Sequence, residues 1–279
     1  MPKTSAGPSR HRVDFVELAL IGGLLLVAMI VMAVHYMTPL LVARSLTADG
    51  LAEFRAFEQA YGPHRESRYA EEWIIRDFFH DKRNGTFLDV GANDYRKENN
   101  TYYLETALGW SGIAIDAQQE FATGYEQHRP RTKFFALFVS DVSDASAQLY
   151  VPKANTLTAS SNRAFAEGED GATVARKVRT ITLDDLLTRE HVDRVDFVSM
   201  DIELAEPKAL AGFDIESFRP ALVCVEAHGT SRQAILNYFQ QHRYVVVGKY
   251  LRADTANLYF MPASRGLEPH AERVEIGPR

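Results

Sequence analysis

Beyond Arg68, short apolar runs alternate regularly with longer amphipathic stretches. Runs of this length suit buried strands and the intervening stretches suit surface helices, so the pattern predicts an α/β fold with a mainly parallel sheet. The expected strands are Thr86–Val90, Ile113–Asp116, Phe134–Val139, Val195–Met200, Leu222–Glu226, Tyr244–Tyr250 and Leu258–Met261. The expected helices are Arg68–His80, Thr101–Leu108, Gln118–His128, Glu206–Gly212 and Ser231–His242.

The last two expected strands follow one another without a helix between them. Only the turn-forming RADTAN separates them, so an antiparallel hairpin is expected to finish the sheet. Residues 155–176 are rich in small and polar side chains, and this composition predicts a mobile loop over the acceptor pocket, with a plain disordered insertion as the alternative.

A continuous apolar segment covers residues 18–43. It is long enough for one bilayer crossing, and a cleaved signal peptide has a shorter apolar region. The sequence therefore predicts a tail at 1–17, a single-pass transmembrane helix at 18–43, a connector at 44–67 with a short juxtamembrane helix, one globular domain at 68–264 and a tail at 265–279. Basic residues flank the span almost equally, with a small excess that favours a cytoplasmic N-terminus.

The charge balance and the cysteine content exclude several classes of protein. There are 31 Lys and Arg residues against 37 Asp and Glu, a net charge of -6, which argues against nonspecific nucleic-acid binding. The single cysteine, Cys224, excludes a disulfide framework and is expected in the core. No histidine or cysteine spacing is typical of a structural zinc site.

Acidic side chains end or directly follow successive expected strands. In open α/β sheets the ligand lies beyond the carboxyl ends of the strands, so these acids are expected on one rim of a binding site. They are Asp89, Asp116, Asp141, Asp201 with Glu203, and Glu226. A lone acid in such a place commonly caps a helix, and for Asp141 that alternative stays open.

Asp116 follows Asp89 at the tip of the next expected strand, where a carboxylate accepts hydrogen bonds from two ribose hydroxyls. Gly91 lets a ligand approach the backbone. The glycine-rich pyrophosphate cradle of dinucleotide sites is missing, because Asn93 and Asp94 follow Gly91. An acidic rim favours a cationic cofactor without phosphate, such as S-adenosylmethionine, since opposite charges at ~4 Å attract by roughly 4 kcal/mol at an effective dielectric constant of 20.

The segment GTFLDVGANDYRKENNTYYLETALGWSGIAIDA at 85–117 resembles the FkbM family of S-adenosylmethionine-dependent methyltransferases. The similarity continues in ITLDDLL at 181–187 and in VDFVSMDIELAEPKALAGFDIESFRPALVCVE at 195–226. It implies a class I methyltransferase fold, a Rossmann-like three-layer sandwich with a seven-stranded sheet whose last strand is antiparallel.

The resemblance also implies which residues contact the cofactor. Asp89, Gly91 and Asn93 would line its methionine and ribose side, and Asp116 would hold the ribose hydroxyls. The adenine would be bordered by Ser140–Asp141.

Further residues would lie beside the amino-acid moiety and the transferring methyl group, namely Asp201 and Glu203. A base for the acceptor hydroxyl is expected from His228 or Glu226, then from Glu203 or Glu206. A structural role for His228 and a helix-starting role for Glu206 are open alternatives. No metal is predicted, although Mg²⁺ bound through water to Asp201 and Glu203 also stays open.

Two residues depart from the family pattern, because Tyr95 and Leu204 stand where the pattern has glycine. Both are expected to face the pocket, where a side chain takes up space. This favours a reshaped acceptor site over a loss of catalysis, because the cofactor acids are all retained.

The sequence as a whole predicts a membrane-anchored O-methyltransferase that acts on a hydroxyl of a glycan, glycolipid or related natural product. An inactive membrane-tethered binding or scaffold protein on the same fold is the alternative, supported by Tyr95 and Leu204. A nucleotide-dependent oxidoreductase is disfavoured by the missing phosphate cradle. Because S-adenosylmethionine is a cytosolic metabolite, the catalytic domain is expected in the cytoplasm, against the small charge bias around the apolar segment.

Overall fold

The computed structural model describes residues 47–263. The expected transmembrane helix at 18–43 and both expected tails lie outside the described residues. Within residues 47–263, no helix has the length and apolar character needed to cross a membrane.

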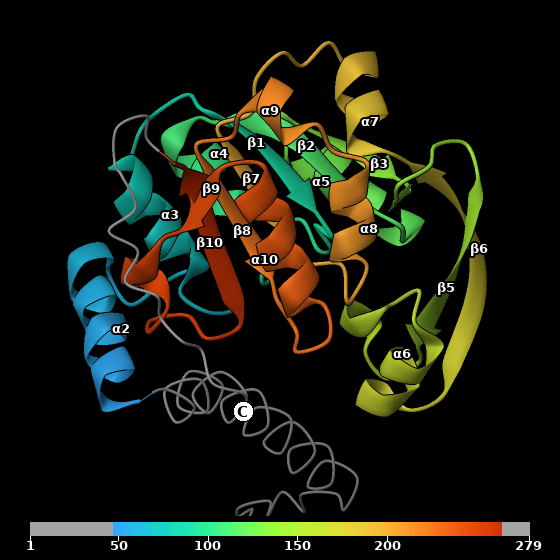
Figure 1. Ribbon diagram of the computed structural model, residues 1–279, viewed down its shortest axis with the longest axis horizontal. Coiled ribbons are helices and arrows are strands. Elements are labelled where there is room, and N and C mark those ends of the chain that lie inside the picture. Colours follow the sequence, from blue (N-terminus) through green and yellow to red (C-terminus); the bar gives the residue numbers. More distant parts are fainter. Residues whose placement is uncertain (1–46, 264–279) are drawn as a thin grey trace, which may run out of the picture. The chain divides into compact units, whose positions relative to one another are not determined.

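Seven strands form the main sheet, in the order β3-β2-β1-β7-β8-β10-β9 (Figure 1). They are β1 Thr86–Val90, β2 Ser111–Asp116, β3 Thr132–Ala136, β7 Phe197–Met200, β8 Leu222–Glu226, β9 Tyr244–Val246 and β10 Asn257–Pro262. Strands β3, β2, β1, β7 and β8 are parallel to one another, whereas β10 pairs antiparallel with both β8 and β9. This confirms the parallel sheet and the closing hairpin.

Helices lie on both faces of this sheet, and one more, at residues 163–170, packs in an arm beside it (Figure 1). They are α2 Ala48–Tyr61, α3 Glu71–Phe79, α4 Tyr102–Leu108, α5 Ala122–His128, α6 Arg163–Asp170, α7 Leu183–Arg189, α8 Glu206–Ala211, α9 Ile215–Phe218 and α10 Arg232–Gln241. Alternate residues of each strand divide between the faces, as the pleat of a strand requires. In β2, Ile113 and Ile115 join the large core beneath α7, α8 and α10, while Ala114 packs with Tyr125 of α5 on the other face.

Two expected strands break within the range that the sequence predicted. The run Phe134–Val139 divides into β3 and a separate two-residue strand, β4 Phe138–Val139, which pairs with a different sheet. The run Tyr244–Tyr250 ends its pairing at Val246 and continues into a short helical turn. In both places the apolar pattern persists because the residues after the break are still packed against the core.

Helix α2 occupies most of the predicted connector and is part of the folded domain. Phe54 meets Trp73 of α3 with ring centroids 5.1 Å apart, and Phe57 lies 6.3 Å from the ring of Tyr250. The compact unit accordingly begins at Ala48 rather than at Arg68.

The prediction of a mobile loop at 155–176 is wrong. This segment contains α6 and the start of β6 Thr173–Ile181, which pairs antiparallel with β5 Ser146–Pro152 as an arm beside the main sheet (Figure 1). Asn162 is the N-cap of α6, and its side chain accepts a hydrogen bond from Phe165 N at 3.1 Å. Most of β6 is exposed or half-buried, so its sequence lacks the apolar signal of a core strand.

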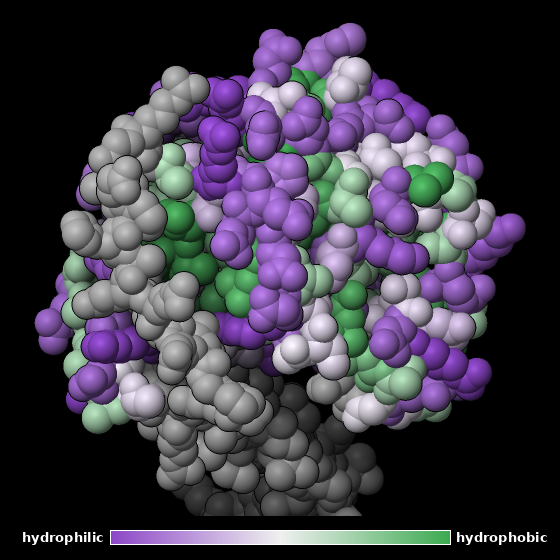
Figure 2. All heavy atoms as spheres, viewed as in Figure 1, coloured by the Kyte–Doolittle hydropathy of each residue, from purple (hydrophilic) through white to green (hydrophobic). Residues whose placement is uncertain are grey.

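The surface seen in Figure 2 is mostly hydrophilic, and its hydrophobic residues gather in small patches. The large apolar side chains that are exposed among residues 47–263 are Val142, Val174 and Val245. Isolated apolar residues of this kind are normal on a soluble surface. They do not mark a functional site, which lies instead in clefts at one edge of the sheet.

Candidate active site

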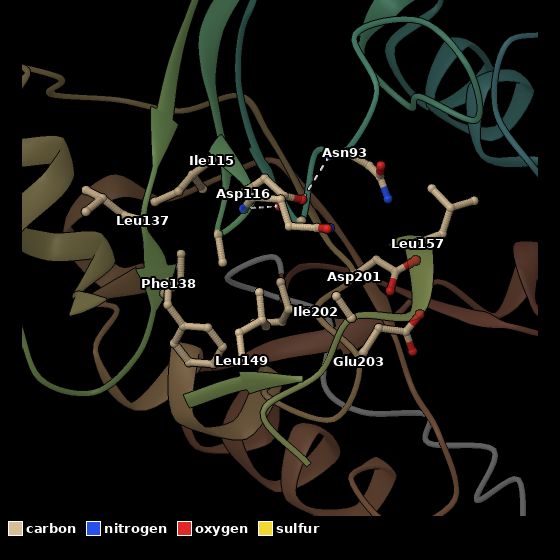
Figure 3. Close-up of a pocket in the computed structure, with 15 residues that line it drawn as sticks. Asn93, Ile115, Asp116, Leu137, Phe138, Leu149, Leu157, Asp201, Ile202 and Glu203 are labelled. Atoms are coloured by element: carbon tan, nitrogen blue, oxygen red, sulfur yellow. Dashed lines mark hydrogen bonds between the residues drawn. The ribbon is translucent and has the colours of Figure 1, made fainter. Parts of the chain in front are cut away.

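Two neighbouring clefts open beyond the carboxyl ends of β1, β2 and β7. The first, here called the apolar cleft, has a volume of about 480 Å³ including the solvent at its mouth, and its walls include Ile115, Leu137, Phe138 and Leu149 (Figure 3). The second, here called the polar cleft, has about 610 Å³ on the same basis and is lined largely by charged and amide side chains. Both clefts share Gly91, Asn93, Leu157, Asp201 and Glu203.

Gly91 allows the ends of β1 and β7 to approach each other. Its φ is +82°, and a Cβ atom there would lie 1.7 Å from the carbonyl oxygen of Asp201. Any other residue would force the two strand ends apart. Gly91 therefore shapes the floor that both clefts share.

Asp116 lines the apolar cleft at the end of β2, as the sequence predicted. Its Oδ1 accepts a hydrogen bond from Gln118 N at 2.8 Å and its Oδ2 accepts one from Asn93 N at 3.1 Å (Figure 3). Burial raises the pKa of Asp116 to about 6, against the lowering effect of these two amides. Each carboxylate oxygen keeps a lone pair for a ligand hydroxyl.

Asp89 does not line either cleft, although it was expected to contact the cofactor. It is only 4% exposed, and its carboxylate accepts a hydrogen bond from Thr101 Oγ1 at 2.8 Å. Burial raises the pKa of Asp89 to about 6, partly opposed by Thr101 and by the charge of Arg129. Asp89 is therefore a buried residue of β1 that binds Thr101, not a residue of the cleft wall.

Sequence reasoning missed the buried network around Arg129. Its guanidinium forms an ion pair with Glu105 at 2.5 Å, donates to Tyr95 O at 2.9 Å and donates to Thr101 Oγ1 at 3.1 Å. The network ties the loop after β1 to α4 and α5. No local pattern marks Arg129, because it follows α5 in a turn and its partners are distant in sequence.

The raised pKa of Asp89 predicts a pH dependence of stability. A carboxyl whose folded-state pKa lies above its unfolded value favours folding when protonated, and this contribution disappears as the pH rises through about 6. Relative to Asp89→Asn, the wild type should gain about 1 kcal/mol of unfolding free energy between pH 7 and pH 5. Urea unfolding at both pH values measures this gain, and a constant difference between the two proteins would contradict it.

Four carboxylates and one imidazole gather where β7 and β8 end. They are Asp201, Glu203, Glu206, Glu226 and His228. His228 Nε2 lies 2.9 Å from Glu226 Oε2 and 3.6 Å from Glu203 Oε2. The structure therefore brings the three predicted catalytic side chains together.

The electrostatics of this cluster follow from burial and from like charges. Burial, followed by the charge of Glu226, raises the pKa of Glu203 to about 8, and burial raises the pKa of Glu206 to about 7. Hydrogen bonding to Glu226 raises the pKa of His228 to about 9. Desolvation by the surrounding protein atoms, followed by the charge of Glu226, raises the pKa of Asp201. The residue still has an exposed surface in the cleft. Burial opposes ionisation of Glu226, but His228 and Asp201 outweigh it and lower that pKa.

A family model for the methyltransferase FkbM domain matches residues 89–246. This range includes Asp116 and the cluster of four carboxylates and His228. The chain belongs to the FkbM methyltransferase family. It is an S-adenosylmethionine-dependent methyltransferase with an α/β Rossmann-like fold, as the resemblance implied.

Solved structures similar to this FkbM protein share little of its sequence, and no curated protein matches it. A TehB-like S-adenosylmethionine-dependent methyltransferase from Corynebacterium glutamicum is 11% identical, with a TM-score of 0.40, over 76% of this chain and 94% of that one. An S-adenosylmethionine-dependent O-methyltransferase from Thermotoga maritima is 13% identical, with a TM-score of 0.39, over 75% and 71% of the two chains. An O-methyltransferase from Bacillus cereus, solved with S-adenosylhomocysteine, is 13% identical, with a TM-score of 0.39, over 78% and 92%.

The residues of the apolar cleft could hold the nucleoside part of S-adenosylmethionine. Besides the carboxylate of Asp116, the cleft contains two buried amide oxygens, Asn93 Oδ1 and Gln118 Oε1, that have no hydrogen-bond partner among residues 47–263. Buried acceptors are costly without a donor, and the hydroxyl and amino groups of adenosine are donors. The surrounding apolar side chains suit the faces of an aromatic base.

Ser140 and Asp141 lie outside both clefts, although the resemblance placed them beside the adenine. Ser140 is buried and donates its hydroxyl to Asp141 Oδ1 at 2.9 Å, while Asp141 is exposed. The residues of this segment that line the apolar cleft come just before them, at Phe138 and Val139.

Tyr95 and Leu204 line neither the apolar cleft nor the polar cleft, contrary to the expectation that both face the pocket. The ring of Tyr95 stacks on His128 with centroids 4.5 Å apart and also contacts Gly124. Leu204 lines a separate, open hollow beside Lys208. Neither departure from the family pattern blocks either cleft.

Leu204 has a φ of +76°, which explains why glycine suits this position. A left-handed backbone costs an L-residue with a side chain roughly 1 to 2 kcal/mol. We expect Leu204→Gly to be more stable than Leu204→Ala by about 1 kcal/mol, the reverse of the usual order, because both lose the side chain but only glycine relieves the strain. Chemical unfolding of the two variants measures the difference, and a more stable alanine variant would refute the strain.

Proposed function

We propose that the protein is an O-methyltransferase for a hydroxyl of a glycan, a glycolipid or a related natural product. The observation that carries this proposal is the junction of the two clefts at Asp201 and Glu203. The apolar cleft suits the nucleoside, and the polar cleft beside it suits an acceptor rich in hydroxyl groups.

When bound, S-adenosylmethionine supplies an electrophilic methyl carbon and a sulfonium that leaves as a neutral thioether. The residues of the chain hold and orient the reactants. Asp116 would accept hydrogen bonds from the ribose hydroxyls, and Asn93 and Gln118 would accept from further donors of the cofactor. Positioning of this kind supplies ~7 to 11 kcal/mol of barrier reduction in well-oriented reactions.

Glu203 is the residue we propose as the base for the acceptor hydroxyl. Of the three predicted catalytic side chains it alone lines both clefts, whereas Glu226 lines only the polar cleft and His228 lines neither. In its ionised form Glu203 would accept the hydroxyl proton, a role worth ~10² to 10⁴ in rate, and its raised pKa makes it a stronger base than an ordinary carboxylate. His228, paired with both glutamates, would hold Glu203 in place.

The polar cleft also offers groups that recognise a polar acceptor. Arg68, Tyr69, Lys97 and Asn100 line it together with the carboxylates. These side chains donate hydrogen bonds to hydroxyl and ring oxygens of the kind that sugars present. They support a carbohydrate-bearing acceptor over an apolar one.

The membrane anchor and the location of the domain also belong to this proposal. The apolar segment at 18–43 would tether the enzyme beside membrane-bound acceptors and raise their effective concentration. The catalytic domain would face the cytoplasm, where its cofactor is made. A reporter fused to the C-terminus and active only outside the cytoplasm would contradict this orientation.

The proposed reaction is tested by following a radioactive methyl group from S-adenosylmethionine into extracted glycolipids and glycans. Label that resists mild alkali is expected, because a methyl ether on a hydroxyl is stable there whereas a methyl ester is hydrolysed. Glu203→Gln should lower the rate by ~10² or more, while exposed Glu126→Gln should not. Alkali-labile label, or an unchanged rate for Glu203→Gln, would contradict the proposal.

A further inference from the structure

Three of the clustered carboxylates converge from separate elements. Asp201 follows β7, Glu206 begins α8 and Glu226 ends β8, and each offers an oxygen within 4.8 Å of the other two. We propose that Asp201, Glu206 and Glu226 bind one divalent cation of the Mg²⁺ or Mn²⁺ type.

Glu206 gives the strongest indication of a ligand. Its side chain is 0% exposed, and its Oε1 accepts a hydrogen bond from Ile202 N at 3.1 Å. Its Oε2 has no hydrogen-bond partner among residues 47–263, and Glu206 is one of the three converging residues. An enclosed carboxylate oxygen without a partner is costly, and a cation would satisfy it.

Acidic groups outnumber basic ones around the site. Glu203 adds a fourth carboxylate, whereas the cations that act on this cluster are Arg68 and, when protonated, His228. With all four carboxyls ionised, two positive charges leave the site with an excess of negative charge. A divalent ion would restore the balance.

The ligand set fits a small, hard cation. Mg²⁺ and Mn²⁺ prefer carboxylate and water oxygens, and Mg²⁺ binds them at ~2.0 to 2.1 Å, so opposite ligands lie roughly 4.2 Å apart. Oxygens that lie within 4.8 Å of one another need only small side-chain rotations to reach this spacing. Water or an acceptor oxygen would complete the coordination.

The proposed ion lies beside the cofactor site rather than within it. Asp201 lines both clefts and its carboxylate points away from Asp116, on the same side as Glu203 (Figure 3). Glu206 lines neither cleft. The cation would therefore bind at the acceptor end, and S-adenosylhomocysteine should not displace it.

The site is tested with Mn²⁺ alone, added to full-length protein without a tag or cofactor and followed by electron paramagnetic resonance. One bound Mn²⁺ with a Kd below roughly 1 mM is expected, together with displacement by Mg²⁺. Glu206→Gln and Asp201→Asn should each weaken binding at least ~10-fold, because each removes a charged ligand. Exposed Glu126→Gln is the matched control and should bind as the wild type does.

Three results would overturn the proposal. They are no binding at several-fold higher Mn²⁺, unchanged binding in both ligand variants, and complete displacement of Mn²⁺ by S-adenosylhomocysteine. Circular dichroism checks the fold of each variant. If buried Glu206→Gln does not fold, the more accessible Asp201→Asn decides the outcome.

Discussion

Asp116→Ala is expected to weaken binding of S-adenosylhomocysteine about 100-fold or more. Asp116 lines the apolar cleft, and its two oxygens keep free lone pairs after accepting from Asn93 and Gln118. Two charge-assisted hydrogen bonds to a ribose contribute ~1.5 to 3 kcal/mol each, and every ~1.4 kcal/mol is tenfold in affinity. Isothermal titration calorimetry measures the change.

The control for this prediction is Asp193→Ala, which removes an exposed aspartate outside both clefts. It should bind S-adenosylhomocysteine with the wild-type affinity. Because Asp116 also organises the backbone at Asn93, thermal unfolding should be compared for the two variants. A folded Asp116→Ala protein that binds within about threefold of wild type, under ~0.7 kcal/mol, would refute the ribose contact.

Arg129→Ala is expected to destabilise the domain by about 3 to 5 kcal/mol. The side chain of Arg129 is 0% exposed and that of its partner Glu105 is 3% exposed, so the substitution leaves a buried carboxylate unpaired. It also removes the donors to Tyr95 O and Thr101 Oγ1. Equilibrium unfolding in urea measures the loss.

The matched control is Arg163→Ala, which breaks another arginine–glutamate pair. Arg163 and Glu167 are 66% and 40% exposed, and an exposed pair of this kind contributes about 0.3 to 0.5 kcal/mol. A similar small loss in Arg129→Ala would show that the buried network does not stabilise the fold.

The sequence predicted the main sheet well because its central strands, β1, β7 and β8, are buried on both faces. The bounds of β1 and β8 are the predicted ones, and the closing hairpin pairs as expected. The arm formed by β5 and β6 was missed because most of β6 stays exposed or half-buried and lacks the apolar run by which core strands are recognised.

The candidate site was predicted in part. Strand-end positions correctly brought Asp116, Asp201 and Glu226 to one rim, since the topology of a parallel sheet fixes where such residues lie. The same rule could not tell which acids turn inward, so Asp89 was expected in the cleft but lies behind it, paired with Thr101. That distinction depends on Thr101 and on the charge of Arg129, both distant from Asp89 in sequence.

The most direct test of the account is a crystal structure of the protein with S-adenosylhomocysteine. In that structure we expect the ribose hydroxyls within hydrogen-bond distance of the Asp116 carboxylate and the adenine between the walls formed by Phe138 and Leu149. A nucleoside bound elsewhere, with Asp116 still bonded only to Asn93 and Gln118, would contradict it.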